Sequence, residues 1–264
     1  MKASCFKQKK LNNEKISAIT CYDYPSARLV ALTNIHCILV GDTLAMTMHG
    51  FPSTVSATIE MMVLHTKAVS RGLGKQFLIS DLPFLSYRIS LNDTMQSVKQ
   101  LLQAGAHAIK LEGGDADACK TISYLTQAGI AVVGHIGLTP QSVHKLSGYR
   151  LQGKTKEDAE RLLMEAKNIE KSGAIALVLE CIPSSLAKTI SQELSIPTIG
   201  IGAGPYTDGQ ILVWHDLLGI QTDLLKPKFL KHYAELGENI TSAINTYHHE
   251  VVNVHYPSME HSYD

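Results

Sequence analysis

The feature that most constrains the fold is a recurring unit: a short apolar run, a polar turn, an amphipathic stretch and then a glycine. The apolar runs show no polar alternation, which is typical of strands covered on both faces of a parallel sheet. An eighth run, around residues 219–225, is the weakest. The clear runs are residues 16–20, 37–40, 77–79, 108–111, 131–133, 174–179 and 198–201.

The amphipathic stretches predict helices with a capping side chain at the start and a glycine at the end. The three clearest have Asn92, Asp115 and Thr155 as predicted caps, and Gly105, Gly129 and Gly173 as the glycines that end them. Serial βα units of this number favour a (β/α)8 TIM barrel, and the pattern leaves a doubly wound sheet as the alternative. We expect one domain over residues 1–264, with a short N-terminal lead and a C-terminal tail.

The amino-acid composition limits the kinds of binding partner and the cellular compartment that we expect for this protein. Charged residues make up only 18% of the chain, below the typical value of about 25%, which predicts a large core, an oligomer interface or both. Basic and acidic residues number 24 each, so a nucleic-acid partner is not expected. No apolar run approaches the roughly 20 residues of a membrane span. The five cysteines show no CxxC spacing and the N-terminus is polar, so we expect a cytoplasmic protein with reduced thiols and no membrane partner.

Acidic residues end four of the apolar runs, and a histidine ends a fifth. These are Asp42, Asp81, Glu112 and Glu180, with His135. The C-terminal ends of barrel strands share one face, so these side chains are expected to converge on one rim. Clustered carboxylates repel one another unless a positive charge lies between them, and oxygen ligands favour Mg²⁺, Mn²⁺ or Ca²⁺. In the alternative, each acid only caps the next helix. That suits Asp81 and Glu180 poorly, because they precede Leu-Pro and Cys-Ile-Pro.

Three further features bear on the site. Lys110 lies two residues before Glu112, so strand periodicity points both to the same face, where the lysine can hold an anionic group. The glycine-rich residues 200–204 are either a phosphate cradle or a place of close backbone packing. The C-terminal histidines fit no closed metal site and are expected at a surface or interface: His248, His249, His255 and His261.

The rim segments resemble ketopantoate hydroxymethyltransferase. The resemblance is in LVGDT (39–43), SDLPF (80–84), IKLEGG (109–114), GHIGLTPQS (134–142), LVLECIP (177–183) and IGIGAG (199–204). It continues in order through DGQILV (208–213), HD (215–216), PKFLK (227–231) and YP (256–257) to His261.

The resemblance implies a (β/α)8-barrel transferase. It would move a hydroxymethyl group from 5,10-methylenetetrahydrofolate to 3-methyl-2-oxobutanoate and so make ketopantoate for pantothenate and coenzyme A synthesis. It further implies one Mg²⁺ per subunit and a homo-oligomer, often a decamer. The residues that match the family's site are Asp42, Asp81 and Glu112 for the metal, Asp42, Thr43, Asp81 and Lys110 for the 2-oxo acid, and Glu180 for the proton. The family usually has serine where this chain has Thr43; the hydroxyl is retained.

The mechanism expected from this resemblance has the substrate chelating the metal and Glu180 removing the C3 proton to give a metal-stabilised enolate. Lys110 and Thr43 would orient the carboxylate, and His135 would either hydrogen-bond within the site or assist proton movement. Two alternatives stay open. The nearer is another metal-dependent barrel acting on oxo acids, such as a lyase or a phosphonopyruvate-type mutase. The farther is a non-catalytic scaffold, which the intact acids at the strand ends argue against.

Overall fold

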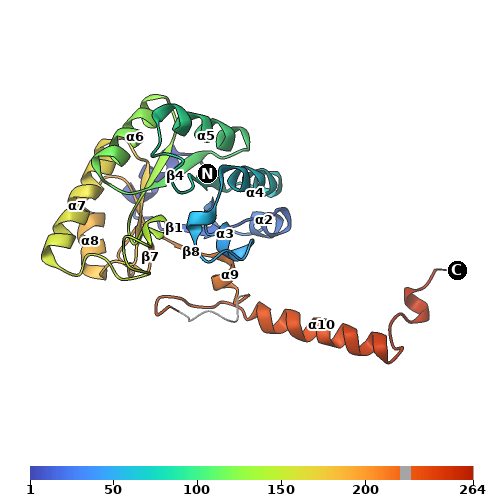
Figure 1. The fold of residues 1–264 in the computed structure, drawn as a ribbon. Helices are drawn as coiled ribbons and strands as arrows, with labels where there is room; N and C mark the ends of the chain where they lie inside the picture. The colour runs from blue at the N-terminus through green and yellow to red at the C-terminus, as the bar shows by residue number, and fades with distance from the viewer. Residues whose placement is uncertain (221–226, 264) are drawn as a thin grey trace. The chain divides into compact units, whose positions relative to one another are not determined.

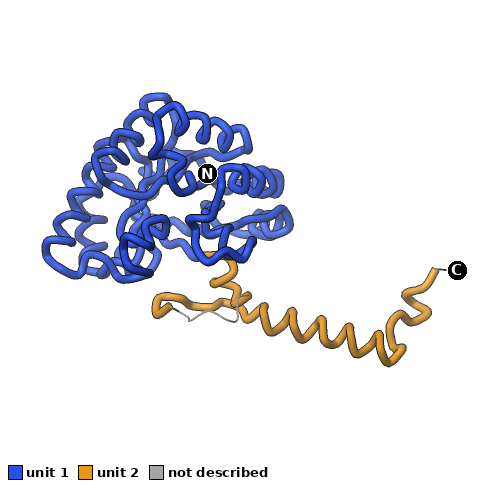
Figure 2. Tube along the Cα trace, viewed as in Figure 1, with its two compact units in different colours: residues 1–212 blue, residues 213–264 orange. Residues whose placement is uncertain are grey.

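The computed structural model describes residues 1–220 and 227–263. The chain divides into two compact units, residues 1–212 and residues 213–264 (Figure 2). None of the helices in the described ranges is both long enough and apolar enough to cross a membrane. The expectation of one domain over the whole chain stays a prediction.

The first unit is a closed barrel of eight parallel strands in sequential order, with β8 pairing β1 (Figure 1). Closure excludes the doubly wound sheet and confirms the (β/α)8 prediction. Seven of the strands fall on the predicted runs. The strands are β1 Ile16–Thr20, β2 Cys37–Val40, β3 Phe77–Asp81, β4 Ala108–Glu112, β5 Val132–Gly137, β6 Ala176–Glu180, β7 Thr198–Ile201 and β8 Gly209–Leu212.

The expected position of the eighth strand, residues 219–225, was wrong. The eighth strand of the closed barrel is β8, which lies earlier in the chain than expected. Residues 221–226, which include most of the expected position, lie outside the described residues. Its run of four residues is interrupted by the exposed Gln210, which hides it from a search for continuous apolar runs. Gly209 is required there, because a Cβ atom would lie 2.3 Å from the Ile16 carbonyl oxygen of the neighbouring strand.

Helices follow most of the strands and cover the outside of the barrel (Figure 1). Residues 202–208, between β7 and β8, contain no helix. The helices of the first unit are α1 Ser4–Leu11, α2 Tyr24–Ala31, α3 Leu44–Thr47, α4 Ile59–Gly72, α5 Leu91–Gln103, α6 Ala116–Gln127, α7 Lys156–Lys171 and α8 Ser184–Glu193, with the 3₁₀ turns η1 Thr54–Ser56 and η2 Pro140–Ser142. The second unit contains α9 Trp214–Leu217, α10 Leu236–Val252 and η3 Met259–His261.

Two of the three predicted helix caps are confirmed. The side chains of Asp115 and Thr155 accept hydrogen bonds from the backbone of the first turns of α6 and α7. Asn92 was wrong as the cap of α5. Ser90 takes that position, because its Oγ accepts from the Asp93 amide at 3.1 Å, which satisfies a backbone donor that would otherwise be unpaired.

The end of the barrel at which the strands begin is filled by α1. Phe6 is buried in the barrel core, with its ring edge-on to Phe77 and the centroids 5.2 Å apart. Lys10 Nζ donates to the carbonyls of Ser191 and Ile196, at 2.6 and 3.0 Å. The opposite end, where the strands finish, is therefore the end available for a site.

Candidate active site

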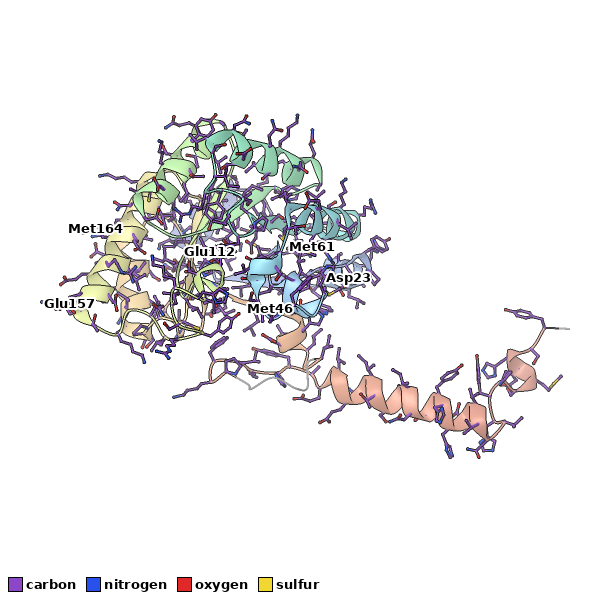
Figure 3. The ribbon with its side chains drawn as sticks, viewed as in Figure 1. Asp23, Met46, Met61, Glu112, Glu157 and Met164 are labelled. Atoms are coloured by element: carbon purple, nitrogen blue, oxygen red, sulfur yellow. The ribbon has the colours of Figure 1, made fainter. Side chains whose placement is uncertain are left out.

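The strand ends place the predicted acids at one mouth of the barrel. Asp81, Glu112 and Glu180 are the last residues of β3, β4 and β6, and Asp42 lies two residues past the end of β2. Strand register sets Asp81 beside Lys110 on β4 and Glu112 beside His135 on β5. All are buried except Glu180, whose side chain is 17% exposed. Figure 3 shows Glu112 among the packed side chains of the barrel.

Lys110 is the central cation of the mouth. Its Nζ lies 3.1 Å from Asp81 Oδ1 and 3.2 Å from His135 Nδ1. Burial disfavours the charged amine, but the carboxylates of Asp81, Glu112 and Asp42 outweigh burial and raise the Lys110 pKa above its usual value. The lysine therefore stays protonated and can hold an anionic group.

His135 links two of the acids. Its Nδ1 lies 3.5 Å from Glu112 Oε1, and its Nε2 lies 3.1 Å from Glu180 Oε2, without the alignment of a hydrogen bond. Burial and Lys110 lower the pKa of His135, but contacts with the Glu112 and Glu180 carboxylates outweigh them and raise it to about 9. In the neutral ring with its proton on Nε2, Nδ1 accepts a hydrogen bond from Lys110, and in the imidazolium the ring forms an ion pair with Glu112.

The acids outnumber the cations in this mouth. Burial raises the pKa of Asp42 well above its usual value, and the neighbouring Asp81 and Glu112 raise it further. Burial also raises the Asp81 pKa, although Lys110 opposes the shift. The four carboxylates with Lys110 and a protonated His135 leave an excess of two negative charges, which a divalent cation would balance.

The residues present fit a magnesium ion. Asp81 Oδ1 is buried and accepts no well-aligned hydrogen bond from the described residues. The available donors are carboxylate oxygens, which Mg²⁺ prefers, and it commonly takes one or two of them with water and substrate oxygens. Within the described part of the chain, no three His, Cys, Asp or Glu side chains already stand together as a ready metal site. A metal site in which substrate and water oxygens complete the coordination begun by the protein carboxylates agrees with both observations.

Sequence reasoning missed Gln141, which joins two of the acids. The residue is 4% exposed, on η2. Its Nε2 donates to Asp42 Oδ2 at 2.8 Å, and its backbone N–H donates to Glu112 Oε2 at 3.1 Å. Tyr87, also missed, donates its hydroxyl to Gln141 Oε1 at 2.9 Å. Gln141 lies within GHIGLTPQS (134–142), one of the segments that resemble the family, whereas nothing in the sequence pointed to Tyr87.

Thr43 lies at the edge of the mouth, at the start of α3. Its Oγ1 is 2.7 Å from the hydroxyl of the buried Tyr22, so the two hydroxyls hydrogen-bond. A Cβ atom at Gly41 would lie 3.0 Å from Thr43 Oγ1, so glycine leaves room for the threonine hydroxyl. The hydroxyl is therefore fixed in direction.

The glycine-rich segment after β7 is a place of close packing. A Cβ atom at Gly200 would lie 2.8 Å from Thr207 Oγ1, and one at Gly204 would lie 2.5 Å from the Ser184 Cβ. These contacts account for the glycines without a phosphate, so packing is the interpretation that the structure supports.

The closed (β/α)8 barrel places this chain in a fold class that several solved structures share. The chain is similar to "Phosphonopyruvate Hydrolase Complex with Oxalate and Mg++", with a TM-score of 0.60 and 12% identity over 99% of this chain and 93% of that one. Phosphoenolpyruvate phosphomutase from Streptomyces platensis subsp. rosaceus matches with a TM-score of 0.63 and 12% identity over 96% and 88%. At such identities these likenesses show the fold alone.

Sequence comparison gives the family. The family model described as ketopantoate hydroxymethyltransferase matches residues 1–259. Proteins named 3-methyl-2-oxobutanoate hydroxymethyltransferase are similar over their full or nearly full length. The one from Legionella pneumophila (strain Corby) is 59% identical over 100% of both chains, and the one from Coxiella burnetii (strain RSA 493) is 49% identical over 97% of this chain and 96% of its own. The chain belongs to the ketopantoate hydroxymethyltransferase family. This confirms the resemblance and the predicted class of transferase.

Proposed function

We propose that the protein transfers a hydroxymethyl group from 5,10-methylenetetrahydrofolate to 3-methyl-2-oxobutanoate, giving ketopantoate for pantothenate synthesis. Family membership supports the reaction. The observation that carries it is the contact of His135 with Glu180 in the same mouth as the cationic Lys110. A carboxylate beside an imidazole can take a proton, while a lysine nearby offsets the negative charge left on the substrate.

The 2-oxo acid would bind between the acids and the lysine. Lys110 would hold its carboxylate, and the Thr43 hydroxyl, fixed by Tyr22, would orient it. Asp42, Asp81 and Glu112 would hold one Mg²⁺ per subunit. When bound, this ion supplies a Lewis acid that polarises the keto oxygen.

Glu180 would act as the general base. Its carboxylate is the most exposed of the four, so it can reach a bound substrate, and His135 Nε2 lies 3.1 Å from it. Glu180 takes the proton from C3, and the C–H electron pair enters the enolate, whose charge Lys110 offsets. Water releases the methylene carbon from the two folate nitrogens as formaldehyde, and the two protons of the water go to those nitrogens, which gives tetrahydrofolate. C3 of the enolate then forms a bond with the formaldehyde carbon, and the resulting oxyanion takes the proton held on Glu180 to become the hydroxyl group.

One assay tests this function and separates it from a lyase or mutase on the same fold. Purified protein is incubated with 3-methyl-2-oxobutanoate, with and without Mg²⁺ and methylenetetrahydrofolate. We expect ketopantoate only when all are present. Exchange of the C3 proton with deuterated water should require Mg²⁺ but no folate. The proposal would be contradicted if ketopantoate formed without the folate, or if neither C3 proton exchange nor ketopantoate were detected.

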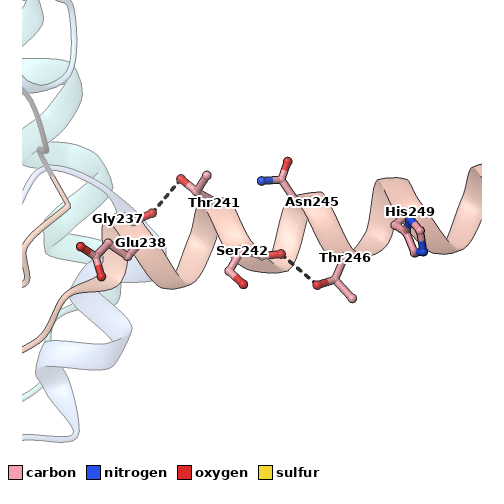
Figure 4. A pocket seen from close by; sticks show the side chains of 7 residues that line it. All are labelled: Gly237, Glu238, Thr241, Ser242, Asn245, Thr246 and His249. Atoms are coloured by element: carbon pink, nitrogen blue, oxygen red, sulfur yellow. Dashed lines mark hydrogen bonds between the residues drawn. The ribbon is translucent and has the colours of Figure 1, made fainter.

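We also propose that the protein assembles with copies of itself, as a decamer by family resemblance. Within the second unit, α10 exposes a stripe at the spacing of one helix face, formed by Ile240, Ile244, Tyr247 and Val251. Figure 4 shows the other, polar face, with Thr241 and Thr246 bonded to carbonyls of their own helix. The low charged fraction of 18% agrees with an interface between identical chains. A cytoplasmic location and the lack of nucleic-acid or membrane partners stay predictions.

A further inference from the structure

A cavity of about 520 Å³ opens beside the acid cluster, lined by the loops that follow β3, β4 and β5. This volume lies in the range of pockets that hold a small organic ligand. We propose that the cavity is the subsite for the folate cosubstrate, with Lys145 binding a carboxylate of its glutamate tail and the rim at Phe84 and Leu85 packing on its rings. The inference rests on the proposed function, which requires a folate but does not say where it binds.

The charges that line the cavity leave one cation without a partner. Arg88 forms two hydrogen bonds of 2.8 Å with the Asp115 carboxylate, and Arg161 donates to Glu165 at 2.7 Å. The exposed Lys145 has no acidic partner among the described residues. An ammonium group at the rim of a cavity attracts an anion, and the tail of a folate ends in carboxylates.

Two apolar side chains at the rim of the cavity are exposed, and one of them has a strained backbone conformation that core packing does not explain. Leu85 is 47% exposed and Phe84 is 37% exposed, so neither serves the core. Leu85 also has a φ angle of 63°, a left-handed conformation that is unfavourable for a bulky residue. Such strain is retained mainly at sites of function. Here it holds an apolar side chain at the rim, where a flat heteroaromatic ring would cover it.

The cavity adjoins the acid cluster through a shared residue. Glu112 belongs both to the acid cluster and to the cavity wall. Gly137 also lines the cavity, and a Cβ atom there would lie 2.2 Å from the carbonyl oxygen of Glu180. A folate in the cavity would therefore lie next to the strand that carries the base, on the side of the mouth bordered by β4 and β5.

The test compares two half-reactions in four proteins: the wild type, Lys145→Ala, Leu85→Gly and the matched control Lys99→Ala, at an exposed lysine on α5. Ketopantoate formation gives the KM for methylenetetrahydrofolate. Exchange of the C3 proton, which uses no folate, reports the 2-oxo acid site. We expect the folate KM to rise about fivefold in Lys145→Ala, the effect of losing one surface ion pair, with the 2-oxo acid KM unchanged. In Leu85→Gly the folate KM should rise although the melting temperature does not fall, because glycine relieves the φ strain.

The outcomes separate this inference from the function on which it rests. If the wild type exchanges the C3 proton and makes ketopantoate, but both variants keep a folate KM within twofold of the wild type, the cavity is not the subsite. If the wild type does neither, the proposed function itself fails. If the KM for the 2-oxo acid rises in Lys145→Ala as much as the folate KM, the lysine serves the other substrate and the assignment is overturned.

Discussion

The buried carboxyl of Asp42 shows how a residue proposed to bind metal can lower the stability of the metal-free protein. It is 3% exposed and lies near Asp81 and Glu112, which raise its pKa beyond the effect of burial. Lys110 and the hydrogen bond from Gln141 favour its charged form. In the absence of metal, the folded protein therefore holds a proton on Asp42 at pH values where the unfolded chain, with a pKa near 3.8, has lost it.

From this linkage we expect the metal-free protein to lose stability as pH rises above about 4, through the raised pKa of Asp42. Asp42→Asn removes the titration and keeps an acceptor for Gln141. At pH 7 without metal it should raise the free energy of unfolding by about 1 kcal/mol or more while abolishing activity. Urea unfolding at pH 5 and pH 8, with and without Mg²⁺, measures this. The exposed Asp117→Asn serves as control. A metal-free Asp42→Asn protein less stable than the wild type at pH 7 would refute the argument.

The proposed role of Glu180 as the general base can be tested with a single substitution. Glu180→Gln keeps the size of the side chain but removes the base. Exchange of the substrate C3 proton with deuterated water should fall at least about 100-fold, while Mg²⁺ and 2-oxo acid still bind. The exposed Glu193→Gln on α8 is the matched control and should exchange like the wild type. Exchange retained in Glu180→Gln would remove this residue from the role of base.

At the scale of elements, the η2 turn after β5 supports the acids that β2 and β4 present. Gln141 donates to Asp42 from its side chain and to Glu112 from its backbone N–H, so Gln141→Leu should release the Asp42 carboxylate, keep the bond to Glu112 and weaken Mg²⁺ binding about 10- to 100-fold. Calorimetric titration with Mg²⁺ measures the change, with Gln100→Leu on the exposed face of α5 as control. If Gln141→Leu lowers the melting temperature but binds Mg²⁺ like the wild type, its role is structural only.

The same elements show how far sequence reasoning reaches. The apolar runs predicted seven strands, because a strand buried on both faces must be apolar throughout, and the acids that end these runs then follow from strand direction. β8 escaped because its four residues include an exposed glutamine. Gln141 and Tyr87 could not be assigned either. Their roles depend on hydrogen bonds across 99 and 54 positions of the chain, which only the closed barrel brings together.

At the scale of the whole molecule, the two units differ in what they bury. The barrel encloses an apolar core and places its functional side chains at the strand ends. In the second unit, Gly237 is the only buried residue of the 17-residue helix α10. An isolated helix of this length is marginal in water, since most helical stability comes from packing of an apolar face. A partner for the stripe at Ile240, Ile244, Tyr247 and Val251 would supply that packing.

If the partner is another copy of this chain, a charge on the stripe should dissociate the assembly. Ile244→Asp buries a carboxylate in the interface, and we expect light scattering with size-exclusion chromatography to show a smaller species than the wild type at equal concentration. Asn245→Asp adds the same charge on the polar face, next along the helix, and should leave the mass unchanged. Because the acid cluster lies wholly within the barrel unit, C3 proton exchange should persist in Ile244→Asp. A wild type that is monomeric, or an Ile244→Asp protein with the wild-type mass, would show that copies of the chain do not cover this stripe.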